Sequence, residues 1–288
     1  MKNFRYRAEA VLVYALYYLF KILPLDAGSA LGGFIARNIG PYLAASRKAR
    51  RNLERALPGK TAQEYDAIIR GMWDNLGRVI AEYPHLEYIA RHRTTFEHAE
   101  IMETALQADK SVFFIGAHMA NWELGASIFA TRFNIPLDIT YRAPNNPYVA
   151  RLLQRARSLG GRVTGYPKAR ESGRKLLSAL KKGHHIGFLI DQKFNEGIAV
   201  PFFGRDAMTN PAFVQLAQKF GSPVIPAYAV RTGGSHFRVI FDRPLDIFTP
   251  GGKPLPLEKV IRQAHIKLES RIKDHPAQWL WLHRRWKD

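Results

Sequence analysis

From about residue 110 onward, short apolar runs alternate with amphipathic segments, and this alternation constrains the fold more than any other feature. Residues 112–115 and 186–190 are continuous apolar runs, which are typical of strands buried on both faces. Further strands are expected at residues 137–141, 224–230 and 237–241. Because strands that alternate with helices form parallel sheets covered on both faces, the sequence predicts an α/β fold with a mostly parallel central sheet flanked by helices.

Local signals place the helices between these strands. Helices are expected at residues 122–132, 147–159 and 169–182, and Gly183 is a suitable residue to end the third. Asn210 is a favourable cap for a further helix that has Pro211 in its first position and stops at Gly221. A late helix is predicted from a stripe of apolar residues that recur at helical spacing: Leu257, Ile261, Ala264, Leu268 and Ile272.

The N-terminal part of the chain has a different character. Residues 1–90 are expected to be mainly helical, and residues 91–288 to form the α/β domain as one structural unit. Residues 10–20 form an apolar run of eleven residues, which is shorter than the roughly 20 that a spanning helix needs. Tyrosines within the run favour a helix at the membrane interface. A signal peptide and a buried helix of a soluble protein are the alternatives for this segment.

The composition points to an anionic partner. The 288 residues carry a formal net charge of +19, and the chain lacks cysteine, which excludes disulfides and thiolate zinc sites. Residues 142–182 hold eleven Lys or Arg residues against one acid, Glu171, and a second basic cluster lies at residues 47–55. A membrane surface, an acidic protein or a nucleic acid would each suit this charge, but no nucleic-acid-binding motif is present.

Candidate catalytic residues follow three of the predicted strands. His118 comes three residues after the first, Arg142 directly after the second and Asp191 directly after the third. Because ligands of open α/β sheets bind beyond the carboxyl ends of the strands, we expect these side chains at one edge of the sheet. Glu123 follows His118 after four intervening residues, and a histidine held by a carboxylate is a common general base.

Other chemistries lack support in the sequence. No His-Glu-x-x-His motif is present, and the adjacent His184 and His185 would point to opposite faces of a strand, so no metal site is expected. No Gly-x-Ser-x-Gly elbow is present either, which argues against a serine hydrolase. The sequence therefore favours a base that activates a hydroxyl of the substrate.

The ordered motifs resemble those of the bacterial lipid A secondary acyltransferases, the lauroyl/myristoyl group of the lysophospholipid-acyltransferase superfamily. The resemblance runs over most of the chain, and this sequence has Glu123 where much of the wider superfamily has aspartate. The segments that carry it are Arg51-Asn52-Leu53 with Leu57-Pro58, residues 116–124, Tyr141-Arg142 with Asn146-Pro147, Asp191-Gln192, Val200-Pro201-Phe202-Phe203-Gly204, Ala207, Thr209, Pro211-Ala212, Pro223-Val224-Ile225-Pro226, and the tail from Gln278 to Trp286.

The resemblance implies transfer of a fatty acyl chain from acyl carrier protein to a hydroxyl of a lipid A precursor. This would occur at the cytoplasmic face of the bacterial inner membrane, without a cofactor and without nucleic acid. The anionic glycolipid acceptor and the acidic carrier protein would both suit a basic protein.

In the mechanism that we expect, His118 removes the hydroxyl proton and Glu123 orients the imidazole. Asn121, Arg142 or backbone N–H groups after His118 would meet the oxyanion, and Arg142, Arg155 and Asp191 would position substrate. Trp279, Trp281 and Trp286 are expected to serve in packing.

Three alternatives remain open from the sequence. The chain could acylate another membrane lipid, such as a lysophospholipid, glycerol phosphate or an ornithine lipid. It could use His118 to activate water as a hydrolase. It could also bind a membrane or nucleic acid without catalysis.

Overall fold

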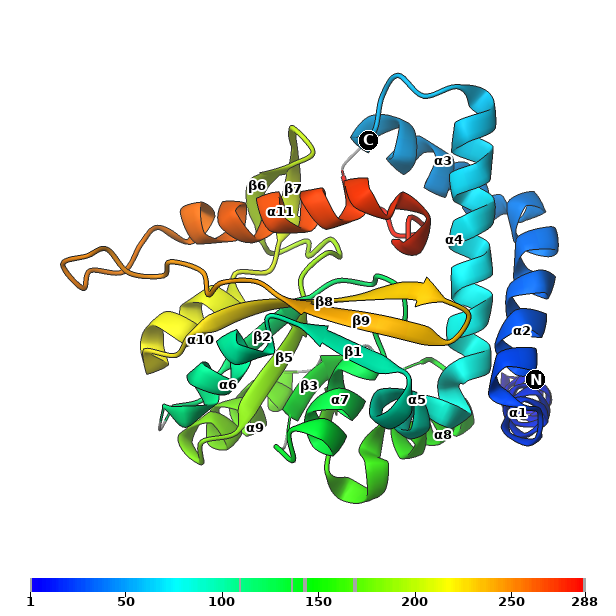
Figure 1. Ribbon diagram of the computed structural model, residues 1–288, viewed down its shortest axis with the longest axis horizontal. Helices are drawn as coiled ribbons and strands as arrows, with labels where there is room; N and C mark the ends of the chain where they lie inside the picture. Colours follow the sequence, from blue (N-terminus) through cyan, green and yellow to red (C-terminus); the bar gives the residue numbers. More distant parts are fainter. Residues whose placement is uncertain (1, 109, 136, 142–143, 168–169, 287–288) are drawn as a thin grey trace.

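A seven-stranded sheet lies at the centre of the molecule in the computed structural model, which describes residues 2–108, 110–135, 137–141, 144–167 and 170–286 (Figure 1). The β8–β9 pair is an antiparallel hairpin, and the other neighbours in this sheet pair in parallel. In spatial order the strands are β1 (Thr94–Glu97), β9 (His236–Phe241), β8 (Val224–Gly233), β2 (Phe113–Gly116), β5 (His185–Leu189), β3 (Leu137–Tyr141) and β4 (Gly165–Pro167). The predicted α/β class with a mostly parallel sheet is therefore confirmed.

The five predicted strands are all present, but four others were not predicted. β1 is a short polar strand at one edge of the sheet, and β4 has three residues. The third and fourth, β6 (Ile198–Phe202) and β7 (Arg205–Thr209), form a separate antiparallel hairpin. These strands are too short or too polar to give a clear apolar pattern, and β6 contains Pro201, which is uncommon inside a strand.

The alternation of side chains along β2 divides the core between the two faces of the sheet. Val112 and Phe114 belong to a cluster with residues of α5 (Leu86–His92), α6 (Ala99–Gln107) and α7 (Leu124–Arg132). Phe113 and Ile115 belong to another cluster, with residues of α9 (Arg170–Lys181), α10 (Ala212–Phe220) and α11 (Leu257–Asp274). Figure 1 shows α7 below the sheet and α11 above it. β2 is thus buried on both faces, as its continuous apolar run predicted.

Residues 2–82 are mainly helical, as expected, with α1 (Lys2–Ile22), α2 (Leu25–Ile39), α3 (Ala44–Ala56) and α4 (Ala62–Glu82). In Figure 1, α2 and α4 run side by side at one end of the sheet. Gly32 and Gly77 permit this approach, because a Cβ atom on Gly77 would lie 2.2 Å from the carbonyl oxygen of Gly32. The expected boundary near residue 90 stays a prediction.

Among the described residues, every helix lacks the combination of length and apolar character that a bilayer span requires. α1 instead packs against α8 (Pro147–Ser158), where the side-chain amide of Asn146 donates to the carbonyl of Tyr6 at 2.8 Å. Asn146 also caps α8, since its side-chain oxygen accepts from the N–H groups of Tyr148 and Val149. The described residues also form four short 3₁₀ helices: η1 (Gly40–Tyr42), η2 (Tyr83–His85), η3 (Leu159–Gly161) and η4 (Pro276–Gln278).

The C-terminal tail lies between the N-terminal helices and the loop that follows β2. Trp279, Trp281 and Trp286 are buried, which confirms the packing role expected for them, and they share a cluster with Leu53 of α3 and Met72 of α4. Residues from both ends of the chain therefore build the wall behind the carboxyl end of β2.

Candidate active site

His118 lies just beyond the carboxyl end of β2, where it is held by Asp191 at the end of the neighbouring strand β5. The Nδ1 atom of His118 is 2.8 Å from Oδ1 of Asp191, and the backbone N–H of His118 donates to Oδ2 at 2.9 Å. A third donor, Nε1 of Trp279, reaches Oδ2 at 2.8 Å. Because a carboxylate accepts, Nδ1 carries a proton and the neutral imidazole has its unprotonated nitrogen at Nε2.

Asp191 remains ionised at this position. Burial alone would raise the pKa of its carboxyl group, but the charge and hydrogen bonds of His118, together with the bond from Trp279, hold the pKa well below its ordinary value. A buried carboxylate with three donors is a rigid partner for the imidazole, and it stabilises the cation that forms when Nε2 takes up a proton.

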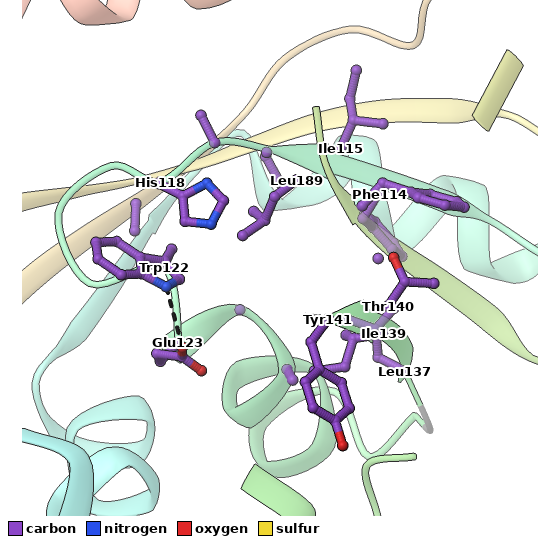
Figure 2. Close-up of a pocket in the computed structure, with 18 of the residues that line it drawn as sticks. Phe114, Ile115, His118, Trp122, Glu123, Leu137, Ile139, Thr140, Tyr141 and Leu189 are labelled. Atoms are coloured by element: carbon purple, nitrogen blue, oxygen red, sulfur yellow. Dashed lines mark hydrogen bonds between the residues drawn. The ribbon is translucent and has the colours of Figure 1, made fainter. Parts of the chain in front are cut away.

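The side chain of His118 faces a cavity of about 430 Å³ between the sheet and α7 (Figure 2). Polar or cationic residues line part of it, among them Gln192 and His283 close to His118: Glu123, Arg157, Gln192, Lys193, His283 and Arg284. Apolar residues line the rest, including Phe114, Ile128, Phe129, Leu137, Ile139 and Val239. In Figure 2, His118, Trp122 and Glu123 lie on one side of the cavity, with Phe114, Leu137 and Ile139 across from them. The cavity thus joins a base to an apolar chamber.

Glu123 does not hold the imidazole, which corrects the expectation from its spacing to His118. Its carboxylate accepts two hydrogen bonds from Arg157 of α8, at 2.7 and 2.6 Å, and one from Nε1 of Trp122 at 3.1 Å. Burial would lower the pKa of Arg157, but the hydrogen bonds and charge of Glu123 outweigh burial and raise it. Arg157 is therefore a permanent cation in the cavity wall, fixed in a bidentate pair.

Asn121 faces the protein core and not the cavity, which corrects its expected role as an oxyanion donor. It is fully buried, and its side-chain nitrogen donates to Glu82 of α4 at 2.8 Å. The carboxylate of Glu82 also accepts from Arg231 of β8 and from Ser29 of α2. This buried polar cluster connects the loop after β2 to two N-terminal helices.

The backbone of the same loop is fixed from both ends of the chain. Ala120 has a left-handed conformation with a φ of 44°, which is costly for a residue with a Cβ atom. Its N–H donates to the carbonyl of Gln278 and its carbonyl accepts from the side chain of Asn75. The N–H groups of His118 and Met119 also have partners within the protein. The N–H groups of Met119 and Ala120 are therefore already engaged, which corrects the expectation of an oxyanion contact for these two groups after His118.

The remaining predicted site residues have different outcomes. Arg142 lies outside the described residues. Arg155 is exposed on α8 and is absent from the cavity lining. It lies two residues before Arg157, and residues two apart on a helix point in nearly opposite directions. The cavity arginine of this helix is Arg157. Sequence reasoning assigned no role to Arg157, Gln192 or His283, and the position of Gln192 directly after a strand-end aspartate was the available signal for it.

Comparison with known proteins identifies the family of this chain. A model of the family described as bacterial lipid A biosynthesis acyltransferase matches residues 2–288, so the chain belongs to this acyltransferase family. The lipid A biosynthesis palmitoleoyltransferase of Escherichia coli (strain K12) is 27% identical over 282 residues, covering 94% of this chain and 88% of that protein. The lipid A biosynthesis acyltransferase of Shigella flexneri gives the same values.

A solved structure was also matched. It is the 1-acyl-sn-glycerophosphate acyltransferase PlsC from Thermotoga maritima, with a TM-score of 0.40 and 13% sequence identity, over 96% of this chain and 100% of that one.

Replacing Asp191 by Asn should destabilise the protein in a pH-dependent manner. Removing one partner of a buried pair costs on the order of 3 kcal/mol, and the free energy of unfolding should fall by about this amount near neutral pH. Because the folded-state pKa of Asp191 is lowered, its stabilising contribution is complete above the ordinary aspartate pKa of about 4 and declines below it. Urea unfolding from about pH 7 to about pH 3 should therefore show the two proteins converging in acid.

The exposed Asp246 provides the matched control, and Asp246→Asn should leave the free energy of unfolding nearly unchanged. A difference between wild type and Asp191→Asn that stays constant over the whole pH range would contradict the charged-pair account.

Proposed function

We propose that this protein transfers a fatty acyl chain from acyl carrier protein to a hydroxyl group of a lipid A precursor, with His118 as the general base. The observation that carries the proposal is the imidazole of His118, held by Asp191 at Nδ1, with Nε2 directed to the polar end of an otherwise apolar cavity. Family membership supports the acyltransferase class, and the names of the relatives refer to lipid A biosynthesis.

In this mechanism the acceptor hydroxyl donates to Nε2 of His118 and loses its proton as its oxygen attacks the thioester carbonyl carbon. A C–O bond forms, and the carbonyl oxygen becomes an oxyanion. When the intermediate collapses, the C–S bond breaks and the thiolate takes the proton from Nε2, so the products are an ester and a thiol. Asp191 stabilises the transient imidazolium throughout.

The cationic side chains that line the cavity favour the binding of anionic substrates. Lys193, Arg284 and Arg157 line the cavity, while Glu123 is the single acid among the described lining residues and is paired with Arg157. A phosphorylated glycolipid and an acidic carrier protein would both be attracted to such a surface, on a chain with a net charge of +19.

Two N-terminal helices support association with a membrane surface, which in our proposal is the cytoplasmic face of the bacterial inner membrane. α2 exposes Leu31, Phe34, Ile35 and Ile39 at helical spacing, and α1 exposes Val11, Leu12, Leu19 and Ile22. Lys21, Arg47, Lys48 and Arg51 are exposed along the same N-terminal segment. Apolar side chains beside basic ones are typical of a helix that lies in the interface of an anionic membrane.

Replacing His118 by Ala should lower the rate of acyl transfer about 10²–10⁴-fold, because this is the usual contribution of a general base. The measurement is the formation of acylated lipid from a lauroyl or palmitoleoyl thioester of acyl carrier protein and a bis-phosphorylated lipid A precursor, read by mass spectrometry. The exposed His92 gives a control, since His92→Ala should transfer at the wild-type rate.

Near-normal transfer by folded His118→Ala would refute the assignment of the base. Free fatty acid as the sole wild-type product would identify a hydrolase, and acylation of a lysophospholipid in place of the lipid A precursor would identify another lipid acyltransferase.

The cavity should also set the length of the acyl chain, and Gly125 allows a test. This residue of α7 lines the cavity, and a Cβ atom built on it meets no atom within 4 Å. Gly125→Leu should fill part of the chamber and shift the preference toward shorter thioesters, as measured by competition between acyl donors. Gly233→Leu is the control, because Gly233 is equally open but lies outside the cavity lining. An unchanged preference in Gly125→Leu would show that the chain binds elsewhere.

Membrane binding should depend on the apolar surface of α2. Ile39 is 57% exposed there, whereas Ile266, which is 52% exposed, belongs to α11. Burying one such side chain is worth about 1.5–3 kcal/mol, so Ile39→Glu should weaken binding to anionic vesicles at least about tenfold in a sedimentation assay. Ile266→Glu should bind like the wild type. Equal losses in the two variants would argue against α2 as the membrane contact.

A further inference from the structure

Gln192 lies directly over the nitrogen that serves as the base. Its side-chain nitrogen is 3.0 Å from Nε2 of His118 and 2.9 Å from Nε2 of His283. The imidazole rings of His118 and His283 are 5.6 Å apart between centroids, so the amide bridges two neighbouring rings. All three residues line the cavity.

With its amide nitrogen in this position, Gln192 pairs with one tautomer of each ring. An amide nitrogen donates hydrogen bonds and does not accept them, and it has two hydrogens to donate. Nε2 of His118 and Nε2 of His283 must therefore both be unprotonated acceptors when Gln192 binds them in this way. This agrees with the proton that Asp191 requires at Nδ1 of His118.

Gln192 thus occupies the position that the reacting hydroxyl needs. The lone pair on Nε2 of His118 accepts from the amide, and the acceptor hydroxyl would have to donate to the same lone pair. The side chain of His118 is 15% exposed, with Asp191 on one nitrogen, Gln192 on the other and the ring of Trp122 at 5.2 Å. In this arrangement the ring of His118 lines the cavity, but its Nε2 lone pair is already engaged by Gln192.

We infer that Gln192, anchored by His283, is a cap on the base that the acceptor hydroxyl must displace. This inference rests on the proposed function and assigns a positioning role to two residues outside the expected mechanism. The cap matters because water is also a nucleophile toward a thioester. If water donated its proton to Nε2, its oxygen would attack the carbonyl carbon, the C–S bond would break, and the thiolate would take up the proton from Nε2. The products would be a free fatty acid and a thiol, and the activated chain would be lost.

A large acceptor that binds in the cavity has enough contacts to move the amide, whereas a water molecule has few. The amide therefore couples exposure of the base to occupation of the acceptor site.

The test is acceptor-independent hydrolysis of a lauroyl or palmitoleoyl thioester of acyl carrier protein, measured as free fatty acid. Gln192→Ala should raise this rate at least about tenfold, because general-base catalysis contributes about 10²–10⁴-fold once water reaches the base. The ratio of free fatty acid to acylated lipid in the presence of the lipid A precursor should rise as well. The double variant Gln192→Ala with His118→Ala should return to the wild-type level of hydrolysis.

His283→Ala provides a second variant, and the exposed side chain of His283 can be removed without disturbing the core. This variant should also raise the rate of hydrolysis, but by less than Gln192→Ala. Gln154→Ala is the matched control, since Gln154 is an exposed glutamine on α8 outside the cavity lining. Thermal unfolding checks that each variant is folded.

The cap and the proposed function fail on different readouts. Wild-type enzyme that forms no acylated lipid overturns the proposed function. Hydrolysis at the wild-type rate in folded Gln192→Ala and His283→Ala, with transfer intact in the wild type, overturns the cap. Increased hydrolysis that persists without His118 overturns it too, because the exposed group would then be another one.

Discussion

The buried carboxylate of Asp191 is the interaction on which the site depends. It is 3% exposed and accepts from the ring and the backbone of His118 and from the indole of Trp279. The carboxylate of Asp191 therefore connects three elements: the end of β2, the end of β5 and the C-terminal tail. Since an ionised carboxylate is costly to bury without partners, the same bonds that orient the imidazole also hold these elements together.

The N-terminal helices and the C-terminal tail hold the loop that carries His118 in place through hydrogen bonds. Glu82 of α4 binds Asn121 and Arg231, while the tail engages the backbone of the loop at Ala120. The left-handed conformation of Ala120 persists because both of its backbone groups are bonded.

The sequence predicted the sheet and one edge of it well, because buried parallel strands leave continuous apolar runs and their carboxyl ends must lie together. His118 and Asp191 were expected there for that reason. Their direct pairing was not predicted, because spacing along the chain favoured Glu123, and the turn at Ala120 directs Glu123 toward Arg157 instead. Arg155 was selected over Arg157 because a cluster of basic residues gives no helical phase relative to a cavity. Strands β1, β4, β6 and β7 were missed because short or polar strands depend on tertiary pairing more than on local pattern.

The central claim is that the neutral ring of His118 has its proton at Nδ1, facing Asp191, and its lone pair at Nε2, facing Gln192 and the cavity. Nuclear magnetic resonance of protein labelled with ¹⁵N-histidine tests this most directly, with the His118→Ala variant used to assign the signals. The account predicts that the neutral ring of His118 shows a protonated Nδ1 and an unprotonated Nε2, and that Asp191→Asn disturbs this tautomer. A neutral ring that carries its proton at Nε2 in the wild type would contradict it, because such a ring offers no lone pair to the cavity.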